Sequence, residues 1–503
     1  MKKLLKITAL LLTLLMLVPM ALACSKDDEQ TEDSTAALPS DTVSTNNGEE
    51  YDANGYLKDY IPDELDYGGV DVYILGWSDE ESGLDFFDGD LTGDKLSDAV
   101  FMRNSSVEGR LNVNLVYELI PGNNKNKGDF ISTITNNVAS QSQPYDIIGS
   151  YSMVPVSLAV NGMLTDIANN QYLHFDAPWW NSSLVEGCSL GNGMYFVSGD
   201  IAPSTTLQAM AMVVNMDMAE ANHIEDPREL VKNGEWTLEK LFEISKSISN
   251  EGNGAEDTYA IVLQGSPAID SFLVGSDISY VDRNREGKYG ISDEFESEKT
   301  FDLMNLLINN MYEGNAISEH NNGDTAFKAE NALIDITTLS QVKKIKADIK
   351  CTYSLIPMPK YEYNDIEQKN YKTAVGFPHT MYSVPINAID VDLASVVLEC
   401  LASESYRQLR PALYETLRYQ NANEAIDVEM FDLIVDGITF DLGRIVHGIF
   451  DTPTDNKWAA SPIALFRDRV AKNDPGFYSA IKSHKTTIDT RLESLNQMAA
   501  KQG

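Results

Sequence analysis

Residues 145–149 read Tyr-Asp-Ile-Ile-Gly, a short apolar run of the kind that forms a buried strand. An amphipathic stretch at 153–160 follows this run and predicts a helix. Such runs and stretches alternate along most of the chain, which predicts an α/β fold built in layers. Strands are predicted at 70–76, 112–120, 145–149, 194–198, 208–215, 258–263, 332–336, 352–357 and 380–386. Helices are predicted at 94–110, 128–141, 153–160, 237–249, 296–312, 338–347, 391–402, 404–421, 427–437, 461–472 and 475–499.

Residues 145–149 also begin an ordered series of short motifs. Each motif alone is weakly specific, whereas their shared order and spacing are much more so. The motifs lie at 145–149, 162–167, 193–197, 212–217, 234–241, 325–332 and 356–360. The series resembles the extracellular solute-binding proteins of the maltose-binding type, the carbohydrate-binding lipoproteins of family 1, over roughly residues 66–495.

This resemblance implies a two-lobed fold of the periplasmic-binding-protein kind, with interwoven lobes and a central ligand cleft. It also implies that ligand closes the lobes around hinges, and that the partners are the permease subunits of an ABC importer. No internal repeat or second linker divides the body, which we expect to span 59–503. Lobe one is expected at about 66–205 and 332–380, lobe two at about 206–331 and 381–503, and the hinges at 204–208, 330–333 and 378–382.

The first residues predict export and a lipid anchor. Three lysines precede an apolar run at 7–23 that is too short for a comfortable membrane span. The run leads into Ala-Leu-Ala-Cys at 21–24, which resembles a bacterial lipobox with its first two residues interchanged. We therefore expect a signal peptide at 1–23, acylation of Cys24 and a location on the extracytoplasmic face of the cell membrane. The alternative is an ordinary secretory signal followed by an unrelated cysteine.

The composition limits the classes of molecule that the protein can bind and the roles that its cysteines can have. Residues 24–58 are polar and acidic with almost nothing to bury, so we expect a disordered tether. The formal net charge of −38 argues against binding nucleic acid, which needs clustered cations. Cys188, Cys351 and Cys400 are expected to be buried apolar residues, with one incidental disulfide as the alternative. We expect a monomer without a cofactor or a metal site.

Candidate ligand-binding residues follow the predicted strands, because open α/β sheets bind ligands where loops leave the carboxyl ends of strands. Aromatic and carboxylate side chains at such ends suit a neutral sugar, whose C–H groups meet the rings and whose hydroxyls meet the polar atoms. Each candidate has a structural alternative as a turn cap or a core residue. The candidates are Trp77, Ser78, Asp79, Ser150, Tyr151, Asp200, Asp270, Phe377, His379 and Trp458. The resemblance places Trp458 where the maltose-binding type carries a sugar-stacking tryptophan.

Other functions are compatible with the same sequence. A surface glycan-capture module or a sensor without a transporter would have the same receptor features, and a peptide or another polar solute could replace the sugar. A lipoprotein glycoside hydrolase would need two carboxylates about 5–10 Å apart, which the 76 acidic residues neither support nor exclude. The sequence contains no zinc-protease motif or phosphate loop. We predict no catalytic residue.

Overall fold

The computed structural model describes residues 44–46, 49–86, 89–140, 144–248, 258–312, 317–320, 323–363, 368, 370–450 and 461–501. The chain divides into two compact units, Met1–Lys58 and Asp59–Gly503. In the first unit β1 (Ser44–Asn46) pairs antiparallel with β2 (Glu49–Tyr51). The predicted signal peptide, Cys24 and most of the predicted tether lie outside the described residues. No helix within the described ranges is long and apolar enough to cross a membrane.

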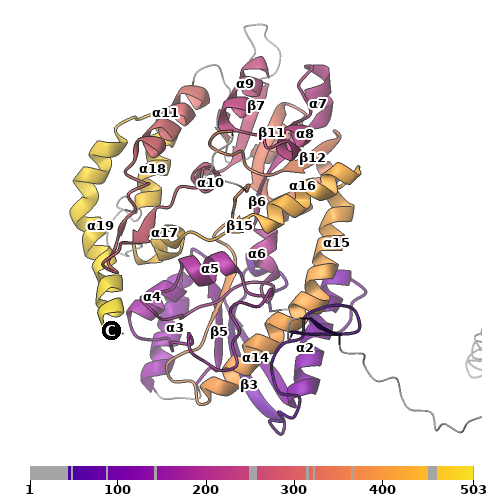
Figure 1. The fold of residues 1–503 in the computed structure, drawn as a ribbon, viewed down its shortest axis with the longest axis vertical. Helices are drawn as coiled ribbons and strands as arrows, with labels where there is room; N and C mark the ends of the chain where they lie inside the picture. The colour runs from indigo at the N-terminus through magenta and orange to yellow at the C-terminus, as the bar shows by residue number, and fades with distance from the viewer. Residues whose placement is uncertain are drawn as a thin grey trace, which may run out of the picture. The chain divides into compact units, whose positions relative to one another are not determined.

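Lobe one is the part of the second unit that surrounds a four-stranded sheet, in the lower half of Figure 1. Its elements are β3 (Val70–Trp77), a 3-10 turn (Glu80–Ser82), α2 (Lys95–Leu111), β4 (Val113–Ile120), α3 (Lys127–Ser140), β5 (Ile147–Tyr151), α4 (Pro155–Val160), α5 (Ser182–Gly187) and β14 (Thr380–Ser383). The sheet order is β14-β5-β3-β4. β3 runs parallel to β4 and β5, and β14 is antiparallel to β5.

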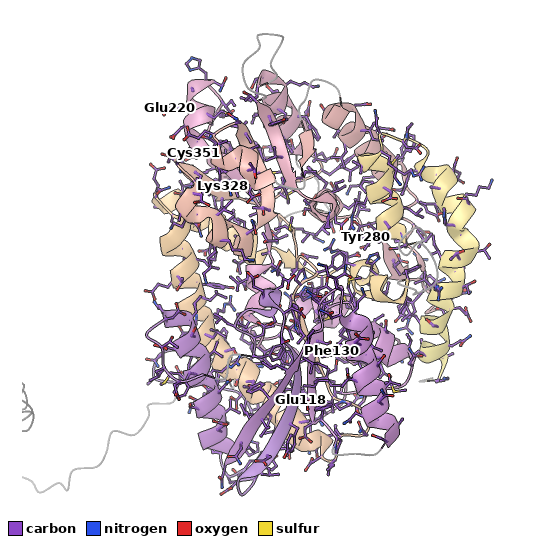
Figure 2. The ribbon with its side chains drawn as sticks, turned by 180° about the vertical axis from the view of Figure 1, so that it is seen from behind. Glu118, Phe130, Glu220, Tyr280, Lys328 and Cys351 are labelled. Atoms are coloured by element: carbon purple, nitrogen blue, oxygen red, sulfur yellow. The ribbon has the colours of Figure 1, made fainter. Side chains whose placement is uncertain are left out.

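Lobe two surrounds a five-stranded sheet. Its elements are β6 (Met210–Asn215), α7 (Met216–Ala221), α8 (Pro227–Lys232), α9 (Leu238–Ile248), β7 (Tyr259–Gln264), α11 (Glu298–Tyr312), β10 (Ile317–His320), α12 (Gly323–Lys328), β11 (Ala332–Thr338), α13 (Leu339–Ile345), β12 (Tyr353–Ile356) and α16 (Ala425–Asp436). The sheet order is β10-β7-β11-β6-β12, and every residue of β6 is buried, as expected for a central strand covered on both faces. Figure 2 shows Glu118 and Phe130 in lobe one, and Glu220, Lys328 and Cys351 in lobe two.

The expected division of the chain between the lobes is wrong for 332–380. Strand β11 pairs with β6, with Ile334 opposite Val214, so it belongs to the sheet of lobe two. β12 pairs with the other edge of β6. Conversely β14, expected in lobe two from residue 381 onward, pairs with β5 of lobe one. Apolar periodicity predicts that a strand is buried but carries no information about its neighbours in the sheet. The sequence therefore could not assign β11, β12 and β14 to the correct lobe.

Two crossovers connect the lobes as a paired ribbon. The first contains α6 (Pro203–Leu207), and the second follows β13 (Thr373–Ala374), which pairs with β15 (Ile438–Thr439). Ala209 of the first forms a bridge with Val375 of the second, and Gly376 N donates to Gln208 O at 2.7 Å. Two of the predicted hinges, 204–208 and 378–382, lie at these crossovers. The third, 330–333, lies instead at the start of β11 within lobe two.

A buried carboxylate ties the two crossovers together. Asp85 accepts a hydrogen bond from Ser204 N at 2.9 Å and short bonds from the hydroxyls of Ser204 and Thr380. Thr380 also accepts a hydrogen bond from Trp77 Nε1 at 2.9 Å. Burial raises the pKa of Asp85 to about 6, although these donors and Arg103 oppose the rise. The ribbon is therefore fixed to lobe one by hydrogen bonds to one side chain.

A long helix makes a third connection. α14 (Val391–Glu404) continues through a π-helical turn (Ser405–Leu409) into α15 (Arg410–Asn421), and Figure 1 shows this helix passing from lobe one to lobe two. The turn is held at the first crossover, because Arg103 of α2 donates to Ile201 O at 3.2 Å and to Ser405 Oγ at 3.4 Å. The sequence predicted two separate helices at this point.

The remaining elements join lobe two and include several that the sequence analysis missed. They are α10 (Asp270–Gly275), β8 (Val281–Arg283), β9 (Tyr289–Ile291), α17 (Leu442–Ile445), a 3-10 turn (Val446–Phe450), α18 (Pro462–Ala471) and α19 (Phe477–Ala500). α18 packs between α11 and α19 through a cluster of Phe295, Phe466 and Phe477, with ring centroids 5.1–6.4 Å apart.

The predicted strand at 194–198 is wrong, because within this range only Val197 forms a bridge, an isolated one to Tyr382. Cys188, Cys351 and Cys400 are buried free thiols.

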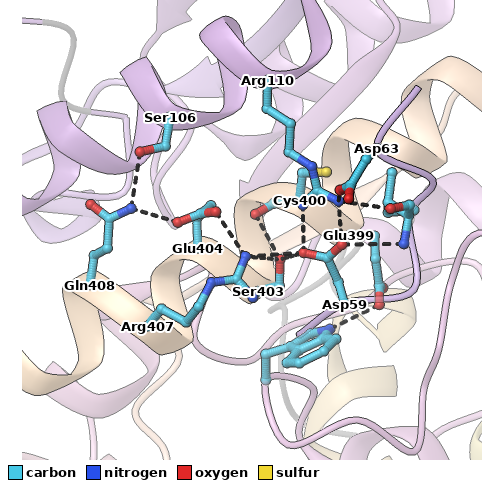
Figure 3. Close-up of polar contacts among 12 residues, drawn as sticks. Asp59, Asp63, Ser106, Arg110, Glu399, Cys400, Ser403, Glu404, Arg407 and Gln408 are labelled. Carbon is cyan, nitrogen blue, oxygen red and sulfur yellow. Dashed lines mark hydrogen bonds and ion pairs between the residues drawn. The ribbon is translucent and has the colours of Figure 1, made fainter. Parts of the chain in front are cut away.

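The second unit begins at a buried ion pair (Figure 3). The Asp59 carboxylate is 1% exposed and accepts hydrogen bonds from Arg110 of α2 at 2.8 Å, Arg407 of the π-helical turn at 3.0 Å and Ser403 at 2.7 Å. Burial alone would raise the pKa of Asp59, but the two arginines and Ser403 lower it to about 2. The start of this unit is thus fixed to α2 and to the long helix.

Candidate ligand-binding site

A polar cluster lies at the junction of the two lobes, around Asp270. This residue opens α10, just beyond the carboxyl end of β7 and the 3-10 turn Ser266–Ile269. Its carboxylate is 1% exposed and accepts a hydrogen bond from Arg467 Nε at 3.0 Å. It also makes short contacts with the guanidinium groups of both Arg444 and Arg467. The predicted residue is therefore the anionic centre of an Arg–Asp–Arg cluster.

Phe377 gives this cluster an aromatic surface. The Arg444 guanidinium lies over the Phe377 ring, 4.5 Å from its centroid, and the His447 ring stacks on it at 5.5 Å. Ser152, just after β5, donates to Phe377 O at 2.6 Å, so lobe one fixes the backbone of the aromatic residue. The ring itself is half-buried. An aromatic face beside charged hydrogen-bond donors is the combination that a polyol requires.

Trp77 and Tyr151 end the two central strands of lobe one and contact each other edge to face, with centroids 5.5 Å apart. Trp77 is fully buried, and its indole N–H is used by Thr380. Burial raises the pKa of the Tyr151 phenol, Glu81 raises it further, and Arg444 and Arg467 oppose the rise. Trp77 is therefore a core residue of lobe one, and Tyr151 packs against it.

Two other predicted residues hold loops. Asp79 accepts hydrogen bonds from Gly122 N at 2.6 Å and Asn123 N at 2.7 Å, so its carboxylate fixes the loop after β4. Ser78 is exposed, and its backbone N–H donates to Ile120 O. Asp200 lies away from the cluster, where it pairs with Arg410 of the long helix at 3.4 Å. Burial raises the pKa of Asp200 to about 7 against the effect of that arginine.

Ser150 and His379 are buried close to the crossovers. The His379 ring contacts Phe440 edge to face at 5.4 Å, and its Nδ1 lies 2.7 Å from Gly376 O. Burial lowers the pKa of His379 to about 4, so the ring is neutral at physiological pH. Among the described atoms, Ser150 Oγ and His379 Nε2 are buried without a hydrogen-bond partner. Trp458 lies outside the described residues.

Arg444, Arg467 and His447 were not predicted from the sequence. Arg444 contacts an aspartate 174 residues away and Arg467 one 197 residues away, and no local pattern marks such a pair. Burial lowers the pKa of His447 well below its ordinary value, and Arg467, Arg444 and Lys127 lower it further. The composition offered one indication, because the chain has only 38 basic residues against 76 acidic ones. An arginine in such a chain is a stronger candidate for a specific binding role than it would be in a chain rich in basic residues.

The Asp270 carboxylate is occupied by Arg444 and Arg467, so the groups of the cluster left for a ligand are the half-buried Phe377 ring and the Arg467 side chain, which is 14% exposed. Within the described ranges no three His, Cys, Asp or Glu side chains are placed to hold a metal ion. A cavity of about 790 Å³ between the β8–β9 hairpin and α19, and one of about 610 Å³ beside α16, are lined by none of the predicted residues. The predicted residues that the structure brings together are Asp270 and Phe377, which both contact Arg444.

No family model and no curated protein matches the sequence. Solved structures do match the fold. An ABC substrate-binding protein from Listeria monocytogenes in complex with cycloalternan has a TM-score of 0.52 at 8% identity, over 84% of this chain and 99% of that one. A sugar transporter protein from Rhizobium etli in an open conformation has a TM-score of 0.54 at 10% identity, over 86% and 99%. This chain has the two-lobed solute-binding-protein fold.

A third structure with the solute-binding-protein fold is the cyclic α-maltosyl-1,6-maltose binding protein from Arthrobacter globiformis, with a TM-score of 0.51 at 13% identity, over 86% of this chain and 98% of that one. These structures are of binding proteins rather than enzymes. The predicted fold class is confirmed, and the resemblance drawn from the ordered motifs agrees with it.

Proposed function

We propose that the protein is a lipid-anchored, extracytoplasmic substrate-binding protein of an ABC importer, which binds a sugar or oligosaccharide between its lobes. The observation that carries the proposal is the cluster of Arg444, Asp270 and Arg467 beside Phe377 at the junction of the lobes. Both lobes supply it, since Ser152 of lobe one fixes the Phe377 backbone while α10 of lobe two supplies Asp270. A ligand bound there would contact both lobes.

The chemistry of the cluster favours a polyol. Hydrogen bonds that involve a charged group contribute about 1.5–3 kcal/mol each, and a ligand lacking the matching hydroxyl leaves a buried group unpaired. The half-buried Phe377 ring offers a flat apolar surface for the C–H face of a sugar. Acylation of Cys24 would hold the receptor at the membrane despite its net charge of −38, with the permease subunits as its partners and the protein itself a monomer.

A thermal-shift screen tests the ligand class. The chain from Ser25 onward is heated with mono- and oligosaccharides and, in parallel, with short peptides. A ligand at 100 times its Kd adds about 2.7 kcal/mol to the free energy of unfolding, which raises the midpoint measurably. Saccharides alone are expected to do so. A shift with peptides only would refute the sugar and keep the receptor, whereas a saccharide that is cleaved during the assay would indicate a hydrolase.

Membrane attachment and transport need separate tests. Cys24→Ser is expected to abolish incorporation of a labelled fatty acid and to release the protein from the membrane fraction, whereas Cys188→Ser leaves both unchanged. Deletion of the gene is expected to abolish uptake of the labelled saccharide that the screen identifies. Unchanged uptake would favour a capture module or a sensor.

A further inference from the structure

The β8–β9 hairpin, residues 281–291, belongs to lobe two and lies between α10 and α11 in the chain. Its turn closes with hydrogen bonds between Asn284 and Lys288, and Arg283 Nε donates to Gly287 O at 2.9 Å. Asn496 of α19 fixes the second strand, because its side chain accepts from Tyr289 N at 2.7 Å and donates to Tyr289 O at 3.3 Å. The hairpin is therefore bound firmly to lobe two.

Lobe one presents a tight loop at residues 189–193. Leu190 and Gly193 exchange backbone hydrogen bonds of 3.0 and 3.1 Å, and Gly191 at the tip has a φ of +68°, which glycine adopts without strain. The chain beyond the loop is fixed within lobe one, where Met194 N donates to the Asp166 carboxylate at 3.0 Å. Loop and hairpin thus belong to different lobes.

The hairpin and the loop are joined by hydrogen bonds from two side chains. The Tyr289 hydroxyl accepts from Gly191 N at 2.6 Å and donates to Ser189 O at 3.0 Å. Arg283 Nη1 donates to Gly191 O at 2.6 Å and to the Asn192 side chain at 3.4 Å. Tyr289 and Gly191 are both buried, so this contact excludes water from its centre.

Further contacts follow the same edge of the junction. Phe440 N donates to Ser183 Oγ of α5 at 2.9 Å. Gly448 approaches Met153 so closely that a Cβ atom there would lie 2.0 Å from the Met153 carbonyl oxygen. At another place Glu80 of lobe one pairs with Lys344 of α13 at 2.8 Å, but these side chains are 80% and 52% exposed, and such pairs contribute little. Of these polar contacts, the hydrogen bond from Gly191 N to the Tyr289 hydroxyl joins two buried residues, and the exposed Arg283 side chain lies beside it.

We propose that the β8–β9 hairpin is an interlobe clasp: the lobes separate only when Tyr289 and Arg283 release the 189–193 loop. The clasp requires no ligand, so it biases the free protein toward the closed arrangement. It rests on the fold and these contacts alone and goes beyond the proposed function. A receptor with such a clasp opens less often, and both ligand entry and ligand release are slower.

Hydrogen exchange and small-angle scattering on the ligand-free protein test the clasp. Tyr289→Phe removes only the hydroxyl, and Arg283→Ala removes the second set of donors. In Tyr289→Phe the Gly191 amide is expected to exchange at least tenfold faster, and in the double variant the radius of gyration is expected to rise. The matched controls, Tyr478→Phe on exposed α19 surface and Arg285→Ala at the exposed hairpin turn, are expected to change neither.

These experiments use ligand-free protein, so their results do not depend on whether the thermal-shift screen identifies a ligand. If Gly191 exchanges at the parent rate and the radius of gyration of the double variant equals that of the parent, the clasp is refuted. Circular dichroism of each variant confirms that the protein is folded, and Arg283→Ala alone repeats the exchange test should the tyrosine variant unfold.

Discussion

Asp335 lies in the middle of β11, where both carboxylate oxygens are buried and neither has a hydrogen-bond partner among the described residues. Burial raises its pKa to about 8, and the nearby Asp324 raises it further. The carboxyl group is therefore protonated at neutral pH in the folded protein, although it ionises in the unfolded chain. Such a side chain in a central strand stabilises the fold less than an apolar residue would.

The titration of Asp335 predicts a stability that falls as pH rises. The folded pKa of about 8 exceeds the unfolded value of 3.8, so the stabilising effect of the proton is complete below pH 4 and is lost up to pH 8. The slope from this group is at most about 1.4 kcal/mol per pH unit. Asp335→Asn is expected to reduce the pH dependence of urea unfolding between pH 5 and 8, whereas the exposed Asp63→Asn is not. An identical slope in Asp335→Asn would contradict this assignment.

Phe377 is the described residue whose ring we expect a sugar to contact. Phe377→Ala is expected to weaken saccharide binding at least tenfold, measured by calorimetry, because the apolar face is lost. Trp458→Ala is expected to weaken it by a similar factor. Phe301→Ala, on exposed surface of α11, is the matched control and leaves the Kd unchanged. If the Phe377 and control variants bind equally, Phe377 does not line the site.

Single residues show where prediction from sequence stops. Trp77, Asp79 and Asp200 follow runs predicted as strands, as the rule for open sheets requires, yet their polar atoms are used by Thr380, by Gly122 and Asn123, and by Arg410. These partners lie up to 303 residues away in the chain. Sequence therefore places a polar side chain at a strand end but cannot tell whether the protein or a ligand occupies it.

Among the elements, the central strands and the longer helices were predicted to within a few residues. β3, β6, β7 and β11 were predicted from apolar runs, because a largely buried strand has a strong local signal. The edge strand β4 was also predicted, although several of its residues are exposed. The short β8 and β9, and helix α10, have no such signal and were missed. The site and the clasp depend on these short elements, so the sequence predicted the scaffold better than the contacts between the lobes.

The contact between Asp59, α2 and the long helix predicts a specific loss of stability. Asp59→Asn is expected to destabilise the protein by about 2 kcal/mol at pH 7, because it leaves Arg110 and Arg407 without their shared carboxylate. The folded pKa of about 2 lies below the unfolded value, so this stabilisation is present above pH 4 and is lost as pH falls toward 2. Urea unfolding measures the change. Asp63→Asn, whose side chain is 97% exposed, serves as the control and is expected to change stability by less than about 0.5 kcal/mol.

At the scale of the whole second unit, the fold predicts a change of shape on binding. A ligand that contacts both lobes stabilises the closed arrangement in proportion to its preference for that state. Saturating saccharide is expected to lower the radius of gyration of the Tyr289→Phe, Arg283→Ala variant more than that of the parent, because the variant starts more open. Small-angle scattering measures both. An unchanged radius in the variant would show that ligand does not close the lobes.

The π-helical turn at Ser405–Leu409 has a consequence for how one helix serves two hydrophobic cores. A π turn accommodates one residue more than an α-helical turn, so it rotates everything downstream by about 100° around the axis. The apolar stripe of α14 is thereby out of phase with that of α15, which buries Leu413 and Leu417. A single deletion within the turn would restore a continuous α-helix of uniform phase. It would also turn Leu413 and Leu417 away from the core they now fill, so the long helix depends on the residue count of its turn as well as on its composition.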